Sequence, residues 1–319
     1  MTRVGVVDLG TNSTRLLVAD VDDGVVREVD RRLTITRLGE GVDERRLLLP
    51  TALARVRNTL GDYRRALESS GAERTLAVAT SAVRDAENGE AFLGEVEWSY
   101  GFDTRLLSGH EEALLTFRGV SAGREVAEGT LVVDVGGGST ELVLGGPEGV
   151  AWHESLDLGC VRVTERFFRS DPPEASEVDA AREHVRAVLA EHVPAGTAPT
   201  RAIGVAGTVT TLAVLSLGLD EEDPEAVDGH ELGSAWIEGQ VERMAAMPVD
   251  EIRRLRGMHP DRAPVILAGA VVLAETLCHF GLERLETSER DIMHGAALAA
   301  AELPERAEGD APPGAYTCC

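Results

Sequence analysis

The sequence predicts an α/β protein in which one domain plan is used twice. Residues 6–14 read V-V-D-L-G-T-N-S-T and residues 132–140 read V-V-D-V-G-G-G-S-T, so six of nine positions are identical at a spacing of 126 residues. In each copy a glycine turn separates two apolar, strand-like runs, and a third such run follows a second turn. Helical and strand-like patterns then alternate, so each half is expected to form β-β-β-α-β-α-β-α.

The remaining elements follow from the spacing of apolar residues and from turn signals. The first half is expected to continue with a helix over 51–69, a strand over 76–80, a glycine-interrupted helix over 81–100, a strand over 102–107, a helix over 109–120 and a polar hinge over 121–130. The second half is expected to contain helices near 160–170 and 174–192, a strand over 202–206, helices near 208–217, 233–247 and 262–280, a strand near 283–287 and a helix over 291–301. These elements predict a first domain over 1–124 and a second over 125–304. Residues 305–319 are charged and contain Pro and Gly, which predicts a disordered tail.

Charge and hydropathy exclude several classes of function. The 319 residues include 31 basic and 55 acidic side chains, giving a formal net charge of −24. A nucleic-acid-binding protein needs a basic face, so no nucleic-acid partner is expected. We expect no signal peptide, and no apolar stretch is expected to reach the eighteen residues of a membrane span. We therefore expect a cytoplasmic protein without a membrane partner.

The residue types also limit the chemistry. The sequence contains no lysine, which excludes Schiff-base catalysis and a P-loop. Any anion must be held by arginine, by backbone N–H groups or by a metal ion. The four cysteines have no metal-ligand spacing and suggest no disulfide framework: Cys160, Cys278, Cys318 and Cys319.

The two glycine turns are candidate phosphate sites. Small residues let the backbone approach an anion, and successive N–H groups in such turns form concave anion sites. We expect the turns to face each other across a cleft and to bind phosphate through residues of both copies: Gly10, Thr11, Asn12, Ser13, Gly136, Gly137, Gly138, Ser139 and Thr140. A single copy of this pattern would fit an ordinary hairpin turn equally well. The spaced duplication favours the phosphate interpretation.

Three acidic residues near these turns are candidate metal ligands. Asp8 and Asp134 end apolar strands, where an unpaired carboxylate is costly, and Glu141 follows the second turn. Mg²⁺ prefers a few carboxylates together with water and phosphate oxygens. The alternative is that the aspartates cap their turns and that the glutamate lies on a strand surface.

Two helix starts complete the candidate site. Gly207 and Thr208 follow a strand and open a helix, whose N-terminal N–H groups favour an anion, although Thr208 could be only the helix N-cap. Ser108 and Glu111 have capping-box spacing, which leaves Glu112 about 100° further around the helix. In that position Glu112 can face the cleft and act as a base on water, unless both glutamates only stabilise the helix N-terminus.

Several motifs in this order resemble the exopolyphosphatase/guanosine pentaphosphate phosphatase (Ppx/GppA) family, over about residues 4–300. They are the turn after Asp8, the Ser-Gly-His-Glu-Glu string at 108–112, the Asp-Val-Gly-Gly-Gly-Ser-Thr-Glu string at 134–141, the glycines at 204 and 207, and Ser-Glu-Arg-Asp-Ile at 288–292. The resemblance implies two actin-like (ribonuclease H-like) domains with mixed central sheets and an interdomain cleft. It also implies Glu112 as the catalytic base, Arg84 as a substrate-phosphate ligand and a homodimer. Without it, Arg84 could be an ordinary surface arginine, and so could Arg15.

The resemblance thus predicts a Mg²⁺-dependent exopolyphosphatase that releases terminal orthophosphate from inorganic polyphosphate. Longer family members carry extra C-terminal helical domains, so the expected substrates are short polymers. Guanosine pentaphosphate is the nearest alternative substrate, because the same residues would serve it. A phosphotransferase between polyphosphate and nucleotides and a non-catalytic nucleotide sensor are further alternatives.

Overall fold

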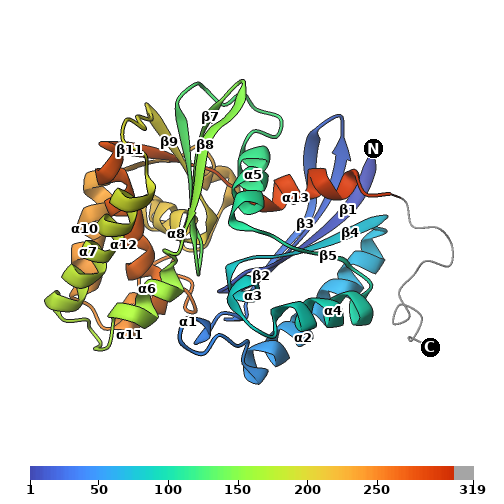
Figure 1. The fold of residues 1–319 in the computed structure, drawn as a ribbon, viewed down its shortest axis with the longest axis horizontal. Helices are drawn as coiled ribbons and strands as arrows, with labels where there is room; N and C mark the ends of the chain where they lie inside the picture. The colour runs from blue at the N-terminus through green and yellow to red at the C-terminus, as the bar shows by residue number, and fades with distance from the viewer. Residues whose placement is uncertain (305–319) are drawn as a thin grey trace. The chain divides into compact units, whose positions relative to one another are not determined.

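The computed structural model describes residues 1–304, which form two compact units (Figure 1). Of the described residues, unit 1 contains Met1–Arg124 together with residues 292–304, and unit 2 contains Glu125–Asp291. The last helix, α13 (Ile292–Ala301), therefore belongs to unit 1, whereas the sequence placed it in a second domain over 125–304. Its apolar residues pack on the sheet of unit 1 and on helix α5 (Gly109–Val120). The predicted disordered tail lies outside the described residues.

Unit 1 is built on a five-stranded mixed sheet in the order β3-β2-β1-β4-β5. Its strands are β1 (Thr2–Leu9), β2 (Ser13–Asp22), β3 (Val25–Ile35), β4 (Arg74–Ala79) and β5 (Asp103–Leu106). The first three strands form an antiparallel meander, and β1, β4 and β5 run parallel. The carboxyl ends of the three parallel strands therefore lie at one edge of the sheet.

Helices cover both faces of this sheet, as the alternation of apolar side chains along each strand requires. Val7 and Leu9 face the core formed with α2 (Pro50–Ser70) and α4 (Gly89–Tyr100), whereas Val4 and Val6 face the core formed with α5 and α13. The other helices of the unit are α1 (Val42–Arg45) and α3 (Ser81–Asp85). The helix expected over 81–100 is thus two helices, because the chain turns at 86–88 and brings Gly89 against the backbone of Val83.

Unit 2 repeats this plan. Its sheet has the order β10-β11-β9-β6-β7-β8, and the run β8-β7-β6-β9-β11 matches β3-β2-β1-β4-β5 in order and direction. The strands are β6 (Thr130–Val135), β7 (Thr140–Gly146), β8 (Gly149–Leu156), β9 (Arg201–Val205), β10 (Glu231–Gly233) and β11 (Arg284–Thr287). Leu9 pairs with Thr14 and Val135 with Thr140, so even the hairpin register repeats at 126 residues. The predicted duplication is confirmed, and β10 is an additional strand that the sequence did not reveal.

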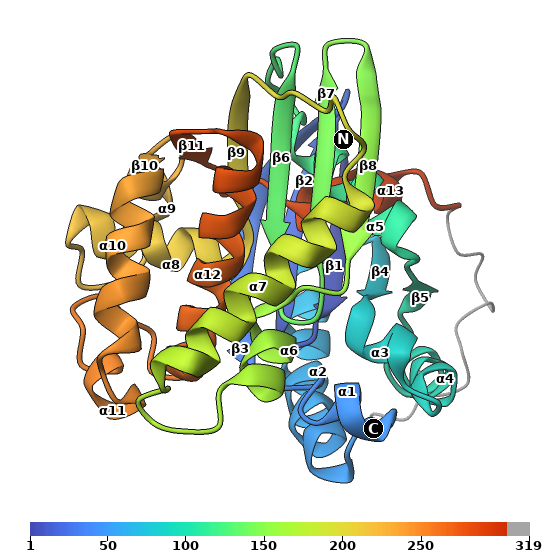
Figure 2. The same cartoon turned by 60° about the vertical axis from the view of Figure 1, so that its left-hand side comes forward.

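The helices of unit 2 enclose one large apolar core. They are α6 (Cys160–Phe167), α7 (Ala175–His192), α8 (Ala206–Leu217), α9 (Pro224–Val227), α10 (Ser234–Ala245), α11 (Val249–Ile252) and α12 (Ala263–Phe280). Helix α12 has 18 residues with a mean hydropathy of 1.8, which is long and apolar enough for a membrane span. The expectation that no apolar stretch reaches this length is therefore wrong. This helix packs beside α6, α7 and α10, and 72% of it is buried (Figure 2). Its apolar character is that of a core helix.

Candidate active site

The two glycine turns have the same local geometry. The N–H of Gly10 donates to the carbonyl of Ser13 at 3.0 Å, and the N–H of Gly136 donates to the carbonyl of Ser139 at 3.0 Å. These two N–H groups therefore close their turns. The expectation that the turns face each other across a cleft concerns the placement of the two units, and it stays a prediction.

In unit 2, the start of helix α6 binds the carbonyl groups of the turn. The N–H of Cys160 donates to Gly136 at 2.9 Å, the N–H of Val161 donates to Gly137 at 2.8 Å, and the Arg162 Nε donates to Gly138 at 2.8 Å. In a planar trans peptide the next N–H points away from the carbonyl. The N–H groups at positions 137, 138 and 139 therefore point away from α6, which is the arrangement of a backbone anion site.

In unit 1, the segment over residues 36–39 binds the carbonyl groups of the glycine turn. The N–H groups of Thr36 and Arg37 donate to the carbonyl of Asn12 at 3.1 and 2.9 Å, and the N–H of Gly39 donates to the carbonyl of Thr11 at 2.8 Å. By the same geometry, the N–H groups of Asn12 and Ser13 point away from this segment. Each unit thus orients a short run of turn N–H groups by binding the carbonyl groups behind them.

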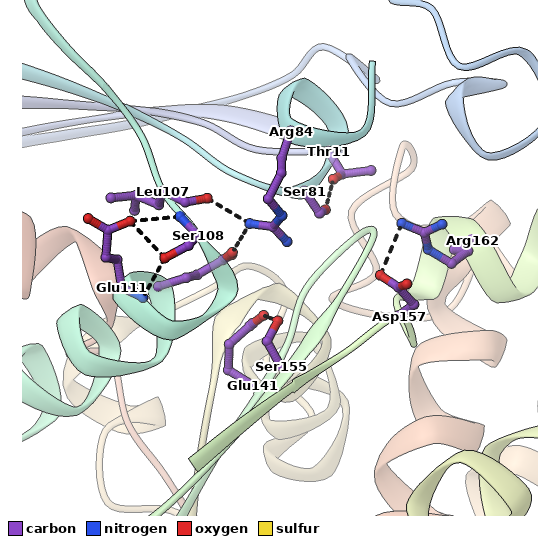
Figure 3. Close-up of polar contacts among 11 residues, drawn as sticks. Thr11, Ser81, Arg84, Leu107, Ser108, Glu111, Glu141, Ser155, Asp157 and Arg162 are labelled. Atoms are coloured by element: carbon purple, nitrogen blue, oxygen red, sulfur yellow. Dashed lines mark hydrogen bonds and ion pairs between the residues drawn. The ribbon is translucent and has the colours of Figure 1, made fainter. Parts of the chain in front are cut away.

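Two threonines predicted to bind phosphate form hydrogen bonds within the protein through their hydroxyl groups. The Thr11 hydroxyl lies 2.8 Å from the Ser81 hydroxyl (Figure 3). The Thr140 hydroxyl donates to the Leu158 carbonyl, and both side chains are buried. These threonine hydroxyls therefore help to fix the two turns.

Arg84 and Glu112 are brought together in unit 1, although 28 residues separate them. The Arg84 Nη1 donates to the carbonyl of Leu107 at 2.8 Å and to the Glu112 carboxylate at 3.1 Å (Figure 3). Both residues follow parallel strands, Arg84 after β4 and Glu112 after β5, so they lie at the sheet edge where the turn after β1 also lies. The Glu112 side chain is 9% exposed and that of Arg84 is 25% exposed, so the pair is mostly shielded from water.

The capping box at the start of helix α5 is present. The Ser108 hydroxyl accepts from the N–H of Glu111 at 3.2 Å, and the Glu111 carboxylate accepts from the N–H of Ser108 at 2.9 Å. The bonds from Ser108 hold the pKa of the Glu111 carboxyl below its usual value. Glu111 is thus committed to the helix end, and the neighbouring Glu112 turns inward to Arg84.

The candidate metal ligands differ between the two units. Asp8 lies opposite Arg15 across the β1–β2 pair, and Arg15 binds its carboxylate at 2.8 Å. At the equivalent position of unit 2, Asp134 lies opposite Glu141, which accepts a 2.8 Å hydrogen bond from the Ser155 hydroxyl. Like charges directly across a strand pair destabilise a sheet, so two buried carboxylates here fit a bound cation.

Two carboxylates are enough protein ligands for a magnesium ion, because the ion commonly binds one or two carboxylates together with water and substrate phosphate. Among residues 1–304, no group of three or more His, Cys, Asp or Glu side chains could hold a metal ion. Asp134 and Glu141 fit a magnesium ion, whereas Asp8 is engaged by an arginine.

The helix start at Gly207 lies beside the turn of unit 2. Strands β6 and β9 pair in parallel, and the Thr208 hydroxyl donates to the carbonyl of Val135 at 3.2 Å. Helix α8 has Val205 as its N-cap, so the alternative role of Thr208 as the N-cap is wrong. Ala206 has a φ of 67°, a left-handed conformation that costs free energy in a residue with a Cβ and is concentrated at functional sites.

Arginines that the sequence did not single out support these elements. Arg262 is buried and donates to the carbonyl of Gly207 at 3.2 Å and to the Thr211 hydroxyl at 2.8 Å. Arg162 bonds the turn at Gly138, as described above. Neither residue belongs to a recognisable short motif, so only the tertiary contacts reveal its position.

Cys160 gives a prediction about this part of unit 2. Cys160 is 6% exposed, and burial raises the pKa of its thiol to about 11. At pH 8 only about one molecule in a thousand would carry the thiolate, which is the reactive form. We expect iodoacetamide at pH 8 to alkylate the exposed Cys278 of the folded protein and to leave Cys160 unmodified, as measured by peptide mass spectrometry. Fast labelling of Cys160 before unfolding would contradict its burial.

Comparisons with known proteins identify the family. The profile of the Ppx/GppA phosphatase family matches residues 17–302. Exopolyphosphatase 2 of Mycobacterium tuberculosis (strain H37Rv) is 41% identical in an alignment of 319 positions, gaps included, which covers 94% of this chain and 99% of the relative. The crystal structure of an exopolyphosphatase-like protein is 35% identical, with a TM-score of 0.87 and coverage of 93% of this chain and 98% of its own. The crystal structure of the Aquifex aeolicus Ppx/GppA family member is 32% identical and has a TM-score of 0.78. The match covers 94% of this chain and 97% of that chain.

These similarities confirm the predicted fold class, with its two α/β domains and their mixed sheets. They extend over nearly the whole chain in sequence and in structure. The chain therefore belongs to the Ppx/GppA phosphatase family and is a hydrolase of phosphoric anhydride bonds.

Proposed function

We propose that this protein is an exopolyphosphatase that releases terminal orthophosphate from inorganic polyphosphate. The observation that carries the proposal is the repeated turn, in which each unit orients backbone N–H groups by binding the carbonyl groups behind them. A backbone anion site of this kind, present in each unit, suits a phosphate-containing substrate. Relatives named exopolyphosphatase support the same substrate.

In the proposed mechanism, Glu112 takes a proton from a water molecule as the water oxygen attacks the terminal phosphorus. The new P–O bond forms in line with the anhydride bond that breaks, and the shortened polyphosphate leaves with the electron pair of that bond. Arg84 lies 3.1 Å from Glu112 and carries a guanidinium group that can bind the oxygens of the transferred phosphoryl group. The turn N–H groups would stabilise the remaining negative charge.

We further propose that the enzyme uses Mg²⁺, held by Asp134 and Glu141. The ion would neutralise charge on the phosphate oxygens. The buried cross-strand position of the two carboxylates supports this assignment. Asp8, the third ligand expected from the sequence, is better explained as the partner of Arg15.

The proposal is tested by measuring phosphate release from short polyphosphate, long polyphosphate and guanosine pentaphosphate, each with and without Mg²⁺. We expect Mg²⁺-dependent release from polyphosphate with a higher kcat/KM than from guanosine pentaphosphate. A preference for guanosine pentaphosphate would favour the nucleotide alternative. Formation of ATP when ADP is present would favour a phosphotransferase, and no release from any substrate would contradict the proposal.

A substitution behind the turn of unit 2 tests its contribution. A Cβ on Gly159 would lie 2.2 Å from the carbonyl oxygen of Gly137, so Gly159→Ala must displace the turn or helix α6. We expect kcat/KM for polyphosphate to fall about tenfold, because small misplacements at reacting groups are costly. The control is Gly239→Ala in helix α10, where no atom apart from the adjoining residues and backbone of its own helix lies within 4 Å of the added methyl. Equal activity of the two variants, measured by phosphate release, would exclude a role for the turn.

A further inference from the structure

The segment over residues 36–40 is the support behind the unit 1 turn. Its N–H groups bind the carbonyls of Thr11 and Asn12 at 2.8–3.1 Å, as described above. Arg37 within it has a φ of 50°, the left-handed conformation that residues with a Cβ rarely adopt. This backbone is therefore not the one that the segment would adopt on its own, and contacts from outside must hold it.

Arg55, on helix α2, supplies three such contacts. Its Nε donates to the carbonyl of Thr36 at 2.6 Å, and its Nη2 donates to the carbonyl of Arg37 at 3.1 Å and to the Glu40 carboxylate at 2.8 Å. One planar guanidinium thus binds both ends of the segment and the carbonyl of its left-handed residue. A rigid fork of this kind holds its acceptors in a fixed arrangement.

The contact between this segment and the turn has little freedom. A Cβ on Gly39 would lie 2.3 Å from the Thr11 Cγ2, so the segment packs against the Thr11 side chain at a distance that only glycine allows. The Thr11 hydroxyl in turn lies 2.8 Å from that of Ser81, at the start of helix α3. A shift of the segment would therefore be passed to Thr11 and to the N–H groups that follow it.

We propose that Arg55 is a positioning residue for the phosphate turn at 10–13, and this inference rests on the proposed function. Arg55 acts through two layers of contacts: it fixes the 36–40 segment, and the segment fixes the turn carbonyls. The orientation of the Asn12 and Ser13 N–H groups toward a phosphate follows from this support. Arg55 itself makes no contact with substrate in this assignment.

The chain offers a matched control on the same helix. Arg57 also forms a two-point ion pair, donating from Nε and Nη2 to Glu95 at 2.6 and 2.8 Å, but it lies away from the 36–40 segment. The Arg55 and Arg57 side chains are similarly exposed, at 38% and 42%. Arg55→Ala and Arg57→Ala therefore remove comparable surface interactions, and only the first removes the support of the turn.

Kinetics provide the first test. For Arg55→Ala we expect kcat/KM for polyphosphate to fall about tenfold, with most of the fall in KM, because misplaced binding donors weaken substrate binding. Arg57→Ala should stay within twofold of the unsubstituted protein. Arg55→Lys should recover only part of the loss, since a single ammonium group lacks the planar fork. Equal kinetics for the two alanine variants, or a loss carried by kcat alone, would overturn the proposal.

Hydrogen exchange provides a test that does not depend on the substrate. In Arg55→Ala, we expect the N–H groups of Gly10, Thr36, Arg37 and Gly39 to exchange at least tenfold faster, and in Arg57→Ala we expect no change. If the protein hydrolysed no polyphosphate but the exchange pattern appeared, the proposed function would fail while the support by Arg55 would stand. Unchanged exchange at Gly10 in Arg55→Ala would overturn the inference even in an active enzyme.

Discussion

Replacement of Glu112 by glutamine is expected to reduce kcat for polyphosphate by about two to four orders of magnitude, the range that a positioned general base contributes. Glutamine keeps nearly the same shape and an oxygen that can accept from Arg84, which bonds the carboxylate at 3.1 Å. It cannot take the proton of an attacking water. The measurement is the initial rate of phosphate release at saturating substrate.

The neighbouring glutamate is the matched control. Glu111 accepts from the N–H of Ser108 in a capping box, and glutamine can fill the same position. We expect Glu111→Gln to retain kcat within about threefold and Glu112→Gln to retain the melting temperature of the unsubstituted protein. If Glu112→Gln kept full activity, or if Glu111→Gln lost as much, Glu112 would not be the base.

The contrast between these two glutamates also shows what could be predicted from the sequence. The capping-box spacing correctly assigned Glu111 to the helix end, and Glu112 does turn into the protein. The duplicated string predicted the two sheets, and its spacing of 126 residues is the spacing of the hairpin registers. Both predictions rest on local sequence patterns: the capping box lies within four residues, and the duplicated string occurs twice in the chain.

Features that depend on distant contacts were not predictable. The last helix belongs to unit 1 because its apolar face packs on α5, where Gly295 lets the helix approach the Leu115 carbonyl, and its sequence alone fits either unit. The roles of Arg55, Arg162 and Arg262 depend on carbonyl groups that lie far away in the sequence. Thr11, Thr140 and Thr208 were predicted as phosphate-binding residues, and the hydrogen bonds that their hydroxyls form with neighbouring segments could not be predicted from local sequence.

Loss of one carboxylate in unit 2 is expected to raise the Mg²⁺ concentration for half-maximal activity. For Glu141→Gln we expect a rise of about 10- to 100-fold, comparable with the loss seen when groups around a bound metal are removed. The reason is the cross-strand pair: Asp134 and Glu141 are direct neighbours in β6 and β7, and both are buried. The measurement is phosphate release over a range of Mg²⁺ concentrations.

Two controls distinguish this assignment from a general effect of removing charge. Glu154, on β8, is a carboxylate of the same sheet that pairs with Leu142, and Glu154→Gln should leave the Mg²⁺ requirement unchanged. Asp8 occupies the position of unit 1 that corresponds to Asp134, but its cross-strand neighbour is Arg15, which already supplies the positive charge. Asp8→Asn should therefore leave the half-maximal Mg²⁺ concentration within twofold. If Asp8→Asn raised the half-maximal Mg²⁺ concentration as much as Glu141→Gln, Asp8 would be a third ligand. A carboxylate whose only role is to pair with Arg15 would not change the affinity for the cation.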